Sequence, residues 1–335
     1  MTRKWHEAGL TRAIPVPRNR AAKRLSSAGT ARKSSNRPIR RRIRLDIGLL
    51  GLVDRAVLRL LHRIKIATPD QLATLVYSSR RTAYRHLARL ALLNLVEVVP
   101  LPPRRGGVPF AYRLSRKAMQ RLGYDDARLG GFAHLRHALD CVEAVCALVR
   151  AARRDSVPTS IELWLPESTA GDAGLLPAHP DGVVVLRRAD RSAVVCLEID
   201  EASEHAPQIR SKLDTWATVF AGRPELVLLF VVPTDSRLAW LRRNAAPGRH
   251  LALEGRSFGV VAADLAGTGF DALVAPVGWR GDRQPLASLI ADPRSRESGA
   301  AVGTPDWIEL LGSGGGEDVE RVLFPEDQRD ADDRA

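Results

Sequence analysis

Apolar residues recur every three or four positions between residues 53 and 64, which predicts an amphipathic helix there. A second helix is expected to begin at Thr68, because Pro69 follows it and Gln71 lies three positions on, the pattern of a capping box. A third helix is expected after Ser78 or Ser79, with alanine and leucine on one face and arginine on the other. The pattern therefore predicts three short helices in succession.

Two short strands are predicted next, at residues 95–99 and 110–114. The segment PLPPRRGG between them is typical of a turn, so we expect a hairpin with Arg104 and Arg105 at its tip. A short helix is predicted from residue 115 to residue 122. Three helices followed by a hairpin are the elements of a winged helix-turn-helix, whose third helix enters the DNA major groove.

The rest of the chain alternates helices and strands. A long helix is predicted over residues 134–154, and two further helices over residues 207–220 and 236–244. Strands are predicted at residues 160–165, 181–188, 193–200, 226–232 and 258–265. The expected fold class is therefore multidomain α/β, with an N-terminal winged helix-turn-helix followed by an α/β domain that contains a mixed sheet.

Charge is divided unevenly along the chain, although its net value is +13. Residues 1–45 carry 14 Lys and Arg against one acid, and residues 46–124 carry 14 against four acids. Residues 125–335 carry 23 Lys and Arg against 33 Asp and Glu. A basic first third and an acidic remainder predict that a polyanion binds to the first third.

Composition and periodicity divide the chain into four predicted parts. Residues 1–45 are a basic arm with too few apolar residues to fold, and residues 46–124 are the winged-helix DNA-binding domain. Residues 132–280 are the α/β domain, and residues 281–335 are a low-complexity acidic tail. The arm is expected to contact DNA phosphates without sequence preference; the alternative is a solubilising segment.

Several classes of protein are excluded by these patterns. The longest apolar run, residues 226–232, is too short to cross a membrane. The first 30 residues lack the apolar stretch of a secretory signal, and the three cysteines include no CxxC pair. We therefore expect a cytoplasmic protein with reduced thiols. A GxxxxGK[ST] segment is also lacking, which disfavours an ATP-driven motor.

The side chains that contact DNA are expected on the third helix and at the hairpin tip. Three arginines four positions apart form a stripe on the helix, with a tyrosine and a further arginine beside it. The predicted DNA-binding residues are Arg80, Arg81, Tyr84, Arg85, Arg89, Arg104 and Arg105. Double-stranded DNA is the partner that this charge favours. The alternative is a winged helix that contacts protein and whose arginines only face solvent.

Acidic residues gather where two predicted strands of the α/β domain meet. Asp181 begins one strand, and Glu198 and Asp200 end the next, two positions apart and therefore on the same side of the sheet. Lys212 lies on the following helix, beside its apolar face. Converging carboxylates repel one another unless a cation lies between them, and a divalent ion with oxygen ligands meets that need. Such a site, with a lysine beside it, has the parts for metal-dependent phosphodiester hydrolysis.

The pattern of Pro180-Asp181, Glu198-x-Asp200 and a lysine on the next helix resembles the PD-(D/E)xK nuclease superfamily, in the version whose lysine has moved from the strand to the helix. The chain also resembles the replication-relaxation family of actinobacterial plasmids and integrative elements, which joins a winged helix to a restriction-endonuclease-like domain. This resemblance covers about residues 46–235 and rests on the segments QLATLVYSSRRTAYRHLARLALLNLVEVV, HLRHALD, PDG, LEID and RSKLDTW.

The resemblance implies a role in plasmid replication or mobilisation and assigns roles to individual residues. Asp181 and Glu198 are the implied ligands of a Mg²⁺ or Mn²⁺ ion, Lys212 the catalytic lysine and Glu162 an accessory acid. Asp200 stands where the usual motif has its lysine and is included among the expected metal ligands. The implied activity is that of a nuclease or relaxase-like enzyme that nicks DNA, with other replication or mobilisation proteins as further partners.

A second interpretation is a DNA-binding regulator whose nuclease-like domain is inactive. Glu201 and Trp216 stand where the family more often has a basic residue and a tyrosine, and acids at strand ends are commonly solvated. His134 and His137 could contact a substrate phosphate or have only a structural role. All four tyrosines lie in the winged-helix region and no His-x-His cluster occurs, so a tyrosine relaxase with a three-histidine metal site is not expected.

Overall fold

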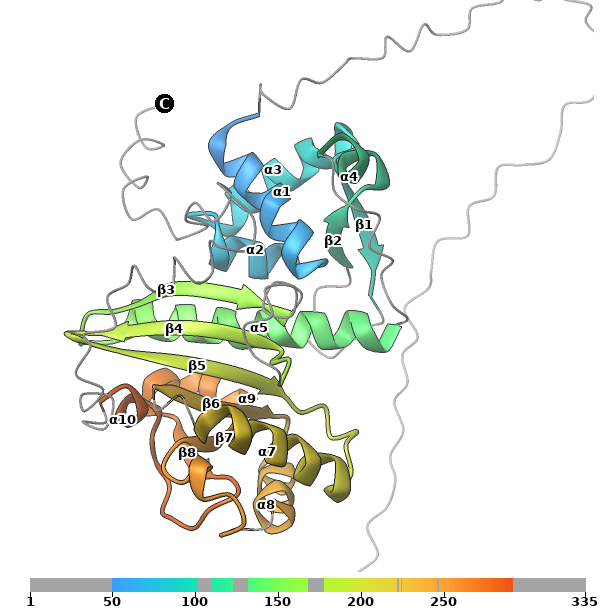
Figure 1. Cartoon of the computed structure of the whole chain (residues 1–335). Coiled ribbons are helices and arrows are strands. Elements are labelled where there is room, and N and C mark those ends of the chain that lie inside the picture. The colour runs from blue at the N-terminus through green and yellow to red at the C-terminus, as the bar shows by residue number, and fades with distance from the viewer. Residues whose placement is uncertain are drawn as a thin grey trace, which may run out of the picture. The chain divides into compact units, whose positions relative to one another are not determined.

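The structure is a computed structural model (Figure 1). It describes residues 50–101, 110–122, 132–167, 178–221, 223, 225–245 and 247–291. These residues all belong to one compact unit. Three helices and a two-stranded hairpin precede a seven-stranded mixed sheet and its helices, which confirms the predicted α/β class. None of the helices in the described ranges is long and apolar enough to span a membrane.

The first three helices are α1 (Leu52–Ile64), α2 (Pro69–Leu75) and α3 (Arg80–Leu92). The capping box of α2 is confirmed, because the Gln71 N–H donates to Thr68 Oγ1 over 3.2 Å and the Thr68 N–H donates to Gln71 Oε1 over 2.9 Å. At the start of α3, the Ser79 hydroxyl accepts from the Thr82 N–H over 3.1 Å. Local hydrogen bonds therefore determine where both helices begin.

The predicted hairpin is also present. It consists of β1 (Val96–Pro100) and β2 (Phe110–Leu114), which pair antiparallel and are followed by α4 (Arg116–Leu122). The predicted tip with Arg104 and Arg105 lies outside the described residues. The predicted basic arm, residues 1–45, lies outside them as well.

The main sheet has the strand order β3-β4-β5-β6-β7-β8-β9. Neighbouring strands are antiparallel from β3 to β5, parallel from β5 to β7 and antiparallel from β7 to β9. The strands are β3 (Thr159–Pro166), β4 (Gly182–Arg188), β5 (Arg191–Ile199), β6 (Leu226–Val232), β7 (Ser257–Val261), β8 (Leu273–Pro276) and β9 (Gln284–Pro285). Every residue of β6 is buried, because a parallel strand inside a sheet is covered on both faces.

Helices cover both faces of this sheet. The long helix α5 (Phe132–Arg154) runs alongside β3 and β4 (Figure 1), while α7 (Ala206–Ala221) and α8 (Asp235–Asn244) pack on the other face. Along β5, Val195 and Leu197 belong to the apolar cluster that contains α5 residues, whereas Val194 and Cys196 belong to the cluster that contains α7 residues. Because side chains alternate along a strand, the next residue of the second set is Glu198.

The N-terminal helices share contacts with the helix that covers the sheet. Gln71 Nε2 on α2 donates to the Leu139 carbonyl of α5 over 3.0 Å and to Glu143 Oε2 over 3.2 Å. One apolar cluster contains buried residues of α1, α2, α3 and α5. Helix α2, which precedes the predicted DNA-binding helix α3, therefore packs directly on α5.

The sequence prediction is wrong at the C-terminal side of the sheet. Residues 258–265 were expected to be one strand, but β7 ends at Val261 and α9 (Ala262–Thr268) follows. The elements β8, β9 and α10 (Leu286–Ala291) were not predicted, and α10 lies within the stretch expected to be an acidic tail. Three apolar side chains of this short helix are buried: Leu286, Leu289 and Ile290. Packing against the rest of the protein stabilises segments that are too short to show a periodic pattern.

Asp155 secures the turn between α5 and β3. Its carboxylate accepts hydrogen bonds from the Val157 N–H over 3.1 Å, from Thr159 Oγ1 over 2.8 Å and from Arg188 Nε over 2.8 Å. The hydrogen bond from Arg188 lowers the pKa of Asp155 to about 2, against the opposing effect of burial. The ionised carboxylate therefore stabilises the folded chain.

We expect Asp155→Asn to lower the free energy of unfolding by about 2 kcal/mol at pH 7. A carboxyl whose pKa is depressed by folding stabilises the protein above its ordinary pKa of 3.8, and this contribution is lost as the pH falls toward 2. Denaturant unfolding of both proteins between pH 7 and pH 3 measures it, with Asp190→Asn in the exposed neighbouring turn as the control. A difference between variant and wild type that does not shrink at acid pH would contradict the assignment.

Candidate functional site

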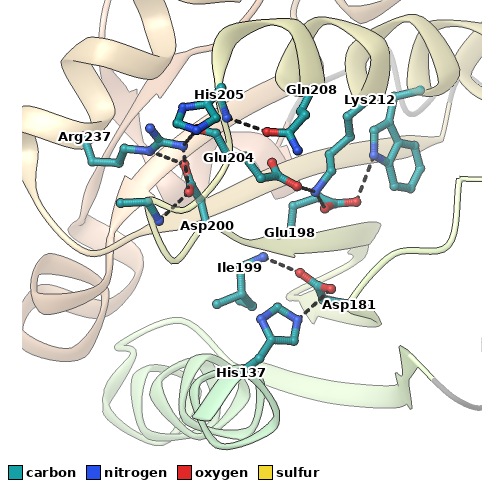
Figure 2. Close-up of polar contacts among 12 residues, drawn as sticks. His137, Asp181, Glu198, Ile199, Asp200, Glu204, His205, Gln208, Lys212 and Arg237 are labelled. Carbon is teal, nitrogen blue, oxygen red and sulfur yellow. Dashed lines mark hydrogen bonds and ion pairs between the residues drawn. The ribbon is translucent and has the colours of Figure 1, made fainter. Parts of the chain in front are cut away.

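Residues from β4, β5 and α5 meet at one end of the sheet (Figure 2). Because β4 and β5 are antiparallel, the residue that precedes β4 lies beside the end of β5. Asp181 occupies this position, and its Oδ2 accepts a hydrogen bond from the Ile199 N–H over 2.6 Å. Figure 2 shows the Asp181 side chain between Glu198 and His137. A backbone hydrogen bond thus orients the Asp181 carboxylate. It lies at the centre of a cluster that consists of His137, Asp181, Glu198 and Lys212.

Glu198 is more deeply buried than Asp181, with a side chain 3% exposed against 14%. Its Oε2 accepts from Lys212 Nζ over 2.7 Å, and its Oε1 accepts from Trp216 Nε1 over 3.0 Å. Burial raises the pKa of Glu198 to about 7, Lys212 opposes this rise, and the charge of Asp181 adds to it. Burial is therefore the main cause of the raised pKa of Glu198, and the neighbouring charges of Lys212 and Asp181 act on it in opposite directions.

Lys212 reaches the cluster from α7. Its Nζ lies 2.7 Å from Glu198 Oε2 and 2.9 Å from Glu204 Oε1, and its side chain is 30% exposed. Burial lowers the pKa of Lys212, but the two carboxylates outweigh it, so that the pKa is raised above its ordinary value. Lys212 is therefore a fixed positive charge with access to solvent.

The structure thus brings together three of the residues that the sequence predicted as catalytic. Asp181 comes from the start of β4, Glu198 from the end of β5 and Lys212 from α7. Trp216 and Glu204, which complete the hydrogen bonds around Glu198 and Lys212, were not predicted to belong to the site. Trp216 is one of the buried apolar residues of α7, and its position on that face gives no sign in the sequence that its indole N–H contacts a carboxylate.

The structure gives Asp200 a different role from the metal ligand that the sequence predicted. Arg237 Nε donates to Asp200 Oδ2 over 2.7 Å, and Arg237 Nη2 donates to Oδ1 over 3.0 Å. The Ala202 N–H donates to the same carboxylate over 2.7 Å, and the side chain is 2% exposed. A buried carboxylate held by a two-pronged arginine contact is committed to that ion pair and is not free to bind a metal ion.

Glu162, the predicted accessory acid, lies away from the cluster. Its Oε1 pairs with Arg187 Nη1 at 3.1 Å, and Arg187 stands near the far end of β4 from Asp181. A β-bulge interrupts the pairing of β3 with β4 at this point. The acid that adjoins the cluster on this side is Glu167, which directly follows β3 and whose N–H donates to the Asp181 carbonyl over 3.2 Å.

Of the two histidines considered from the sequence, His137 enters the cluster. Its Nε2 lies 2.9 Å from Asp181 Oδ1, and this hydrogen bond raises the pKa of His137 to about 9. His134, one turn earlier on α5, is exposed. The spacing of histidines along the chain gave no sign of this contact, because Asp181 comes from a strand far along the sequence.

The predicted DNA-binding arginines of α3 fall into two groups, which differ in whether an acidic side chain pairs with them. Arg80 Nε pairs with Asp70 Oδ1 at 2.6 Å, and Arg89 Nη2 pairs with the buried Asp54 at 3.0 Å. Arg81 and Arg85 are exposed, and neither has an ion pair within the part of the chain that the structure describes. Tyr84 lies beside them and makes an edge-on contact with Phe110 of the hairpin. Arg81 and Arg85 are therefore the arginines of α3 whose charges are open to a partner.

Comparison with known proteins adds one finding to this geometry. The family model described as replication-relaxation matches residues 58–226, which is half of the chain. The match includes α2, α3, the hairpin, Asp181 with the β4 strand that follows it, and Lys212. No curated protein and no solved structure matches the chain.

Proposed function

The chain belongs to the replication-relaxation family, and from that premise we propose that it binds double-stranded DNA and nicks one strand during the replication or mobilisation of a mobile element. In this proposal α3 and the β1–β2 hairpin form a winged helix that docks on DNA. The cluster around Asp181 and Glu198 is a cleavage site of the PD-(D/E)xK type. Other replication or mobilisation proteins are further partners in the same process.

One observation carries the proposal: a carboxylate before β4, a carboxylate at the end of β5 and a lysine on α7 lie at one sheet edge. Lys212 Nζ lies 2.7 Å from Glu198 Oε2, and the Asp181 charge is one cause of the raised pKa of Glu198. Two interacting carboxylates and a lysine, delivered by three separate elements, match the residue types and the order of the nuclease motif. Shifted pKa values in such a cluster are typical of functional sites.

The donors in this cluster fit a divalent ion such as Mg²⁺ or Mn²⁺. Asp181 and Glu198 offer carboxylate oxygens, the ligands that these ions prefer. The unfavourable charge interaction between the two acids is the electrostatic condition that a bound cation relieves. When bound, such an ion supplies Lewis-acid activation of a phosphate oxygen.

The protein's own residues would bind and orient the scissile phosphate. Lys212 is held in its charged form by Glu198 and Glu204, so it can donate a hydrogen bond to a phosphate oxygen. Glu204 keeps a counter-charge near Lys212 if Glu198 turns toward a cation. Trp216 holds the other oxygen of Glu198 in place from α7. Positioning of this kind supplies a large share of the catalysis of phosphodiester cleavage.

A non-catalytic DNA-binding regulator is the second candidate function. The observation in its favour is that both oxygens of Glu198 already accept hydrogen bonds, from Lys212 and from Trp216. In addition, Glu201 stands where the family resemblance leads us to expect a basic residue. In that case the buried cluster would hold β4, β5 and α7 together, and cleavage would be absent.

Incubation of the purified chain with a supercoiled plasmid that carries the DNA of its own mobile element distinguishes the two functions. We expect open circles in the presence of Mg²⁺ or Mn²⁺ and none in the presence of a chelator. A gel-shift assay of the same samples controls for DNA binding. Bound plasmid that stays supercoiled with every metal ion would reject the nuclease and favour the regulator.

A further inference from the structure

A second group of metal-binding side chains lies on the α5 side of Asp181. It shares Asp181 with the proposed cleavage site and adds His137 and Cys141, which that site does not use. One ligand atom from each of His137, Cys141 and Asp181 lies within 4.8 Å of the other two. Among the residues that the structure describes, this is the one group of three or more such side chains with that spacing. All three side chains are partly exposed, so an ion could reach them from solvent.

The backbone explains why these three residues meet. His137 and Cys141 are four positions apart on α5, so their side chains lie on the same helix face, one turn apart. Asp181 approaches them from the start of β4, and Ile199 of β5 holds its second oxygen. The Ile199 N–H therefore donates a hydrogen bond to a proposed metal ligand and sets the direction of its carboxylate. Hydrogen bonds of this kind are common around metal ligands.

The three donors are an imidazole nitrogen, a thiol sulfur and a carboxylate oxygen. Mg²⁺ prefers oxygen ligands alone, whereas Zn²⁺ is bound by all three donor types. Zinc sites that take part in chemistry use three protein ligands and keep a fourth position open. This set of donors therefore differs in kind from the oxygen pair of Asp181 and Glu198.

The spacing of the donors is close to what zinc requires. His137 Nε2 and Asp181 Oδ1 are 2.9 Å apart and share a proton, while two ligands of one tetrahedral zinc ion lie about 3.3 Å apart. Exchange of the shared proton for an ion thus needs a small movement of the imidazole and the carboxylate. Cys141 carries a neutral thiol without metal, because burial raises its pKa. Formation of a sulfur–zinc bond would release that proton to water.

We propose that His137, Cys141 and Asp181 bind a zinc ion whose fourth position is open to water or to a phosphate oxygen. The site ties α5 to β4 and β5 at the centre of the sheet edge. It does not depend on the cleavage proposed above, because binding of the ion can be measured without DNA.

Cobalt(II) titration of the reduced, metal-free, full-length chain tests this site. We expect one equivalent of Co²⁺ to produce a thiolate-to-cobalt charge-transfer band, which Zn²⁺ then abolishes by displacement. Cys141→Ser should remove the band and weaken Co²⁺ binding at least about tenfold. Cys146→Ser and Cys196→Ser are matched controls, because these free cysteines are buried elsewhere, and they should keep the band.

Two results would overturn the zinc site: no charge-transfer band in the wild-type chain, or a band that persists in Cys141→Ser. His137→Gln gives a second variant, in which affinity for Co²⁺ should fall although all three thiols remain. The nicking assay separates this proposal from the previous one. A band without nicking supports the zinc site and rejects cleavage, whereas Mg²⁺-dependent nicking without a band rejects the zinc site and supports cleavage.

Discussion

Asp181→Asn is expected to slow nicking of supercoiled DNA at least about 100-fold, because it removes a negative charge from the proposed metal site. Asparagine has nearly the same shape as aspartate, and its amide oxygen can still accept the hydrogen bond from the Ile199 N–H. The folded structure should therefore persist. The rate of conversion to open circles with Mn²⁺, measured at equal DNA binding, checks this result.

Glu162→Gln is the matched control for that substitution. Glu162 is an acid of the neighbouring strand β3, and its contact in the structure is an ion pair with Arg187. Loss of this charge away from the cluster should leave the rate of nicking unchanged. Equal rates in wild type and Asp181→Asn would contradict the placement of the metal ion, and a large loss in Glu162→Gln would show that net charge is responsible instead.

The double variant Arg81→Ala/Arg85→Ala is expected to bind DNA about 10- to 100-fold more weakly than the wild type. These arginines are exposed on α3, whereas Arg80 and Arg89 are held by Asp70 and Asp54. If each contacts one phosphate, the slope of log affinity against log salt should fall by about 2. Fluorescence anisotropy with a labelled duplex at several salt concentrations measures both quantities.

Arg242→Ala/Arg243→Ala removes the same charge from α8 and is the control for α3. This pair lies on the helix that packs against the far face of the sheet, so DNA affinity and salt slope should stay close to the wild-type values. The same loss of affinity in both double variants would show that binding follows net charge and not α3. Unchanged affinity in Arg81→Ala/Arg85→Ala would contradict the assignment of α3 to the DNA interface.

Local features of the sequence predicted much of the fold. The cap at Thr68 and the buried run of β6 depend on neighbouring residues, and both are confirmed. Lys212 was expected near the acids because it lies beside the apolar face of α7, and it contacts Glu198. Patterns that depend on a few adjacent positions can thus be interpreted without knowledge of the rest of the chain.

Contacts between distant parts of the chain could not be predicted in this way. Strand alternation places Asp200 on the same face as Glu198, but nothing near it in the sequence indicates that Arg237 of α8 binds its carboxylate. His137 likewise meets Asp181 only because α5 packs across the start of β4. These two contacts are determined by how whole helices and strands pack against one another, and a single sequence gives little information about that packing.

Single-turnover nicking by Glu198→Gln beside the wild type, with protein in excess so that all plasmid is bound, tests the central claim most directly. The variant keeps an acceptor for Trp216, and Glu204 still balances the charge of Lys212. We predict that both proteins bind the plasmid equally, that the wild type forms open circles with Mn²⁺ but not with chelator, and that Glu198→Gln leaves the plasmid supercoiled. Equal conversion by both proteins, or bound and intact plasmid with both, would contradict a cleavage site at Asp181 and Glu198.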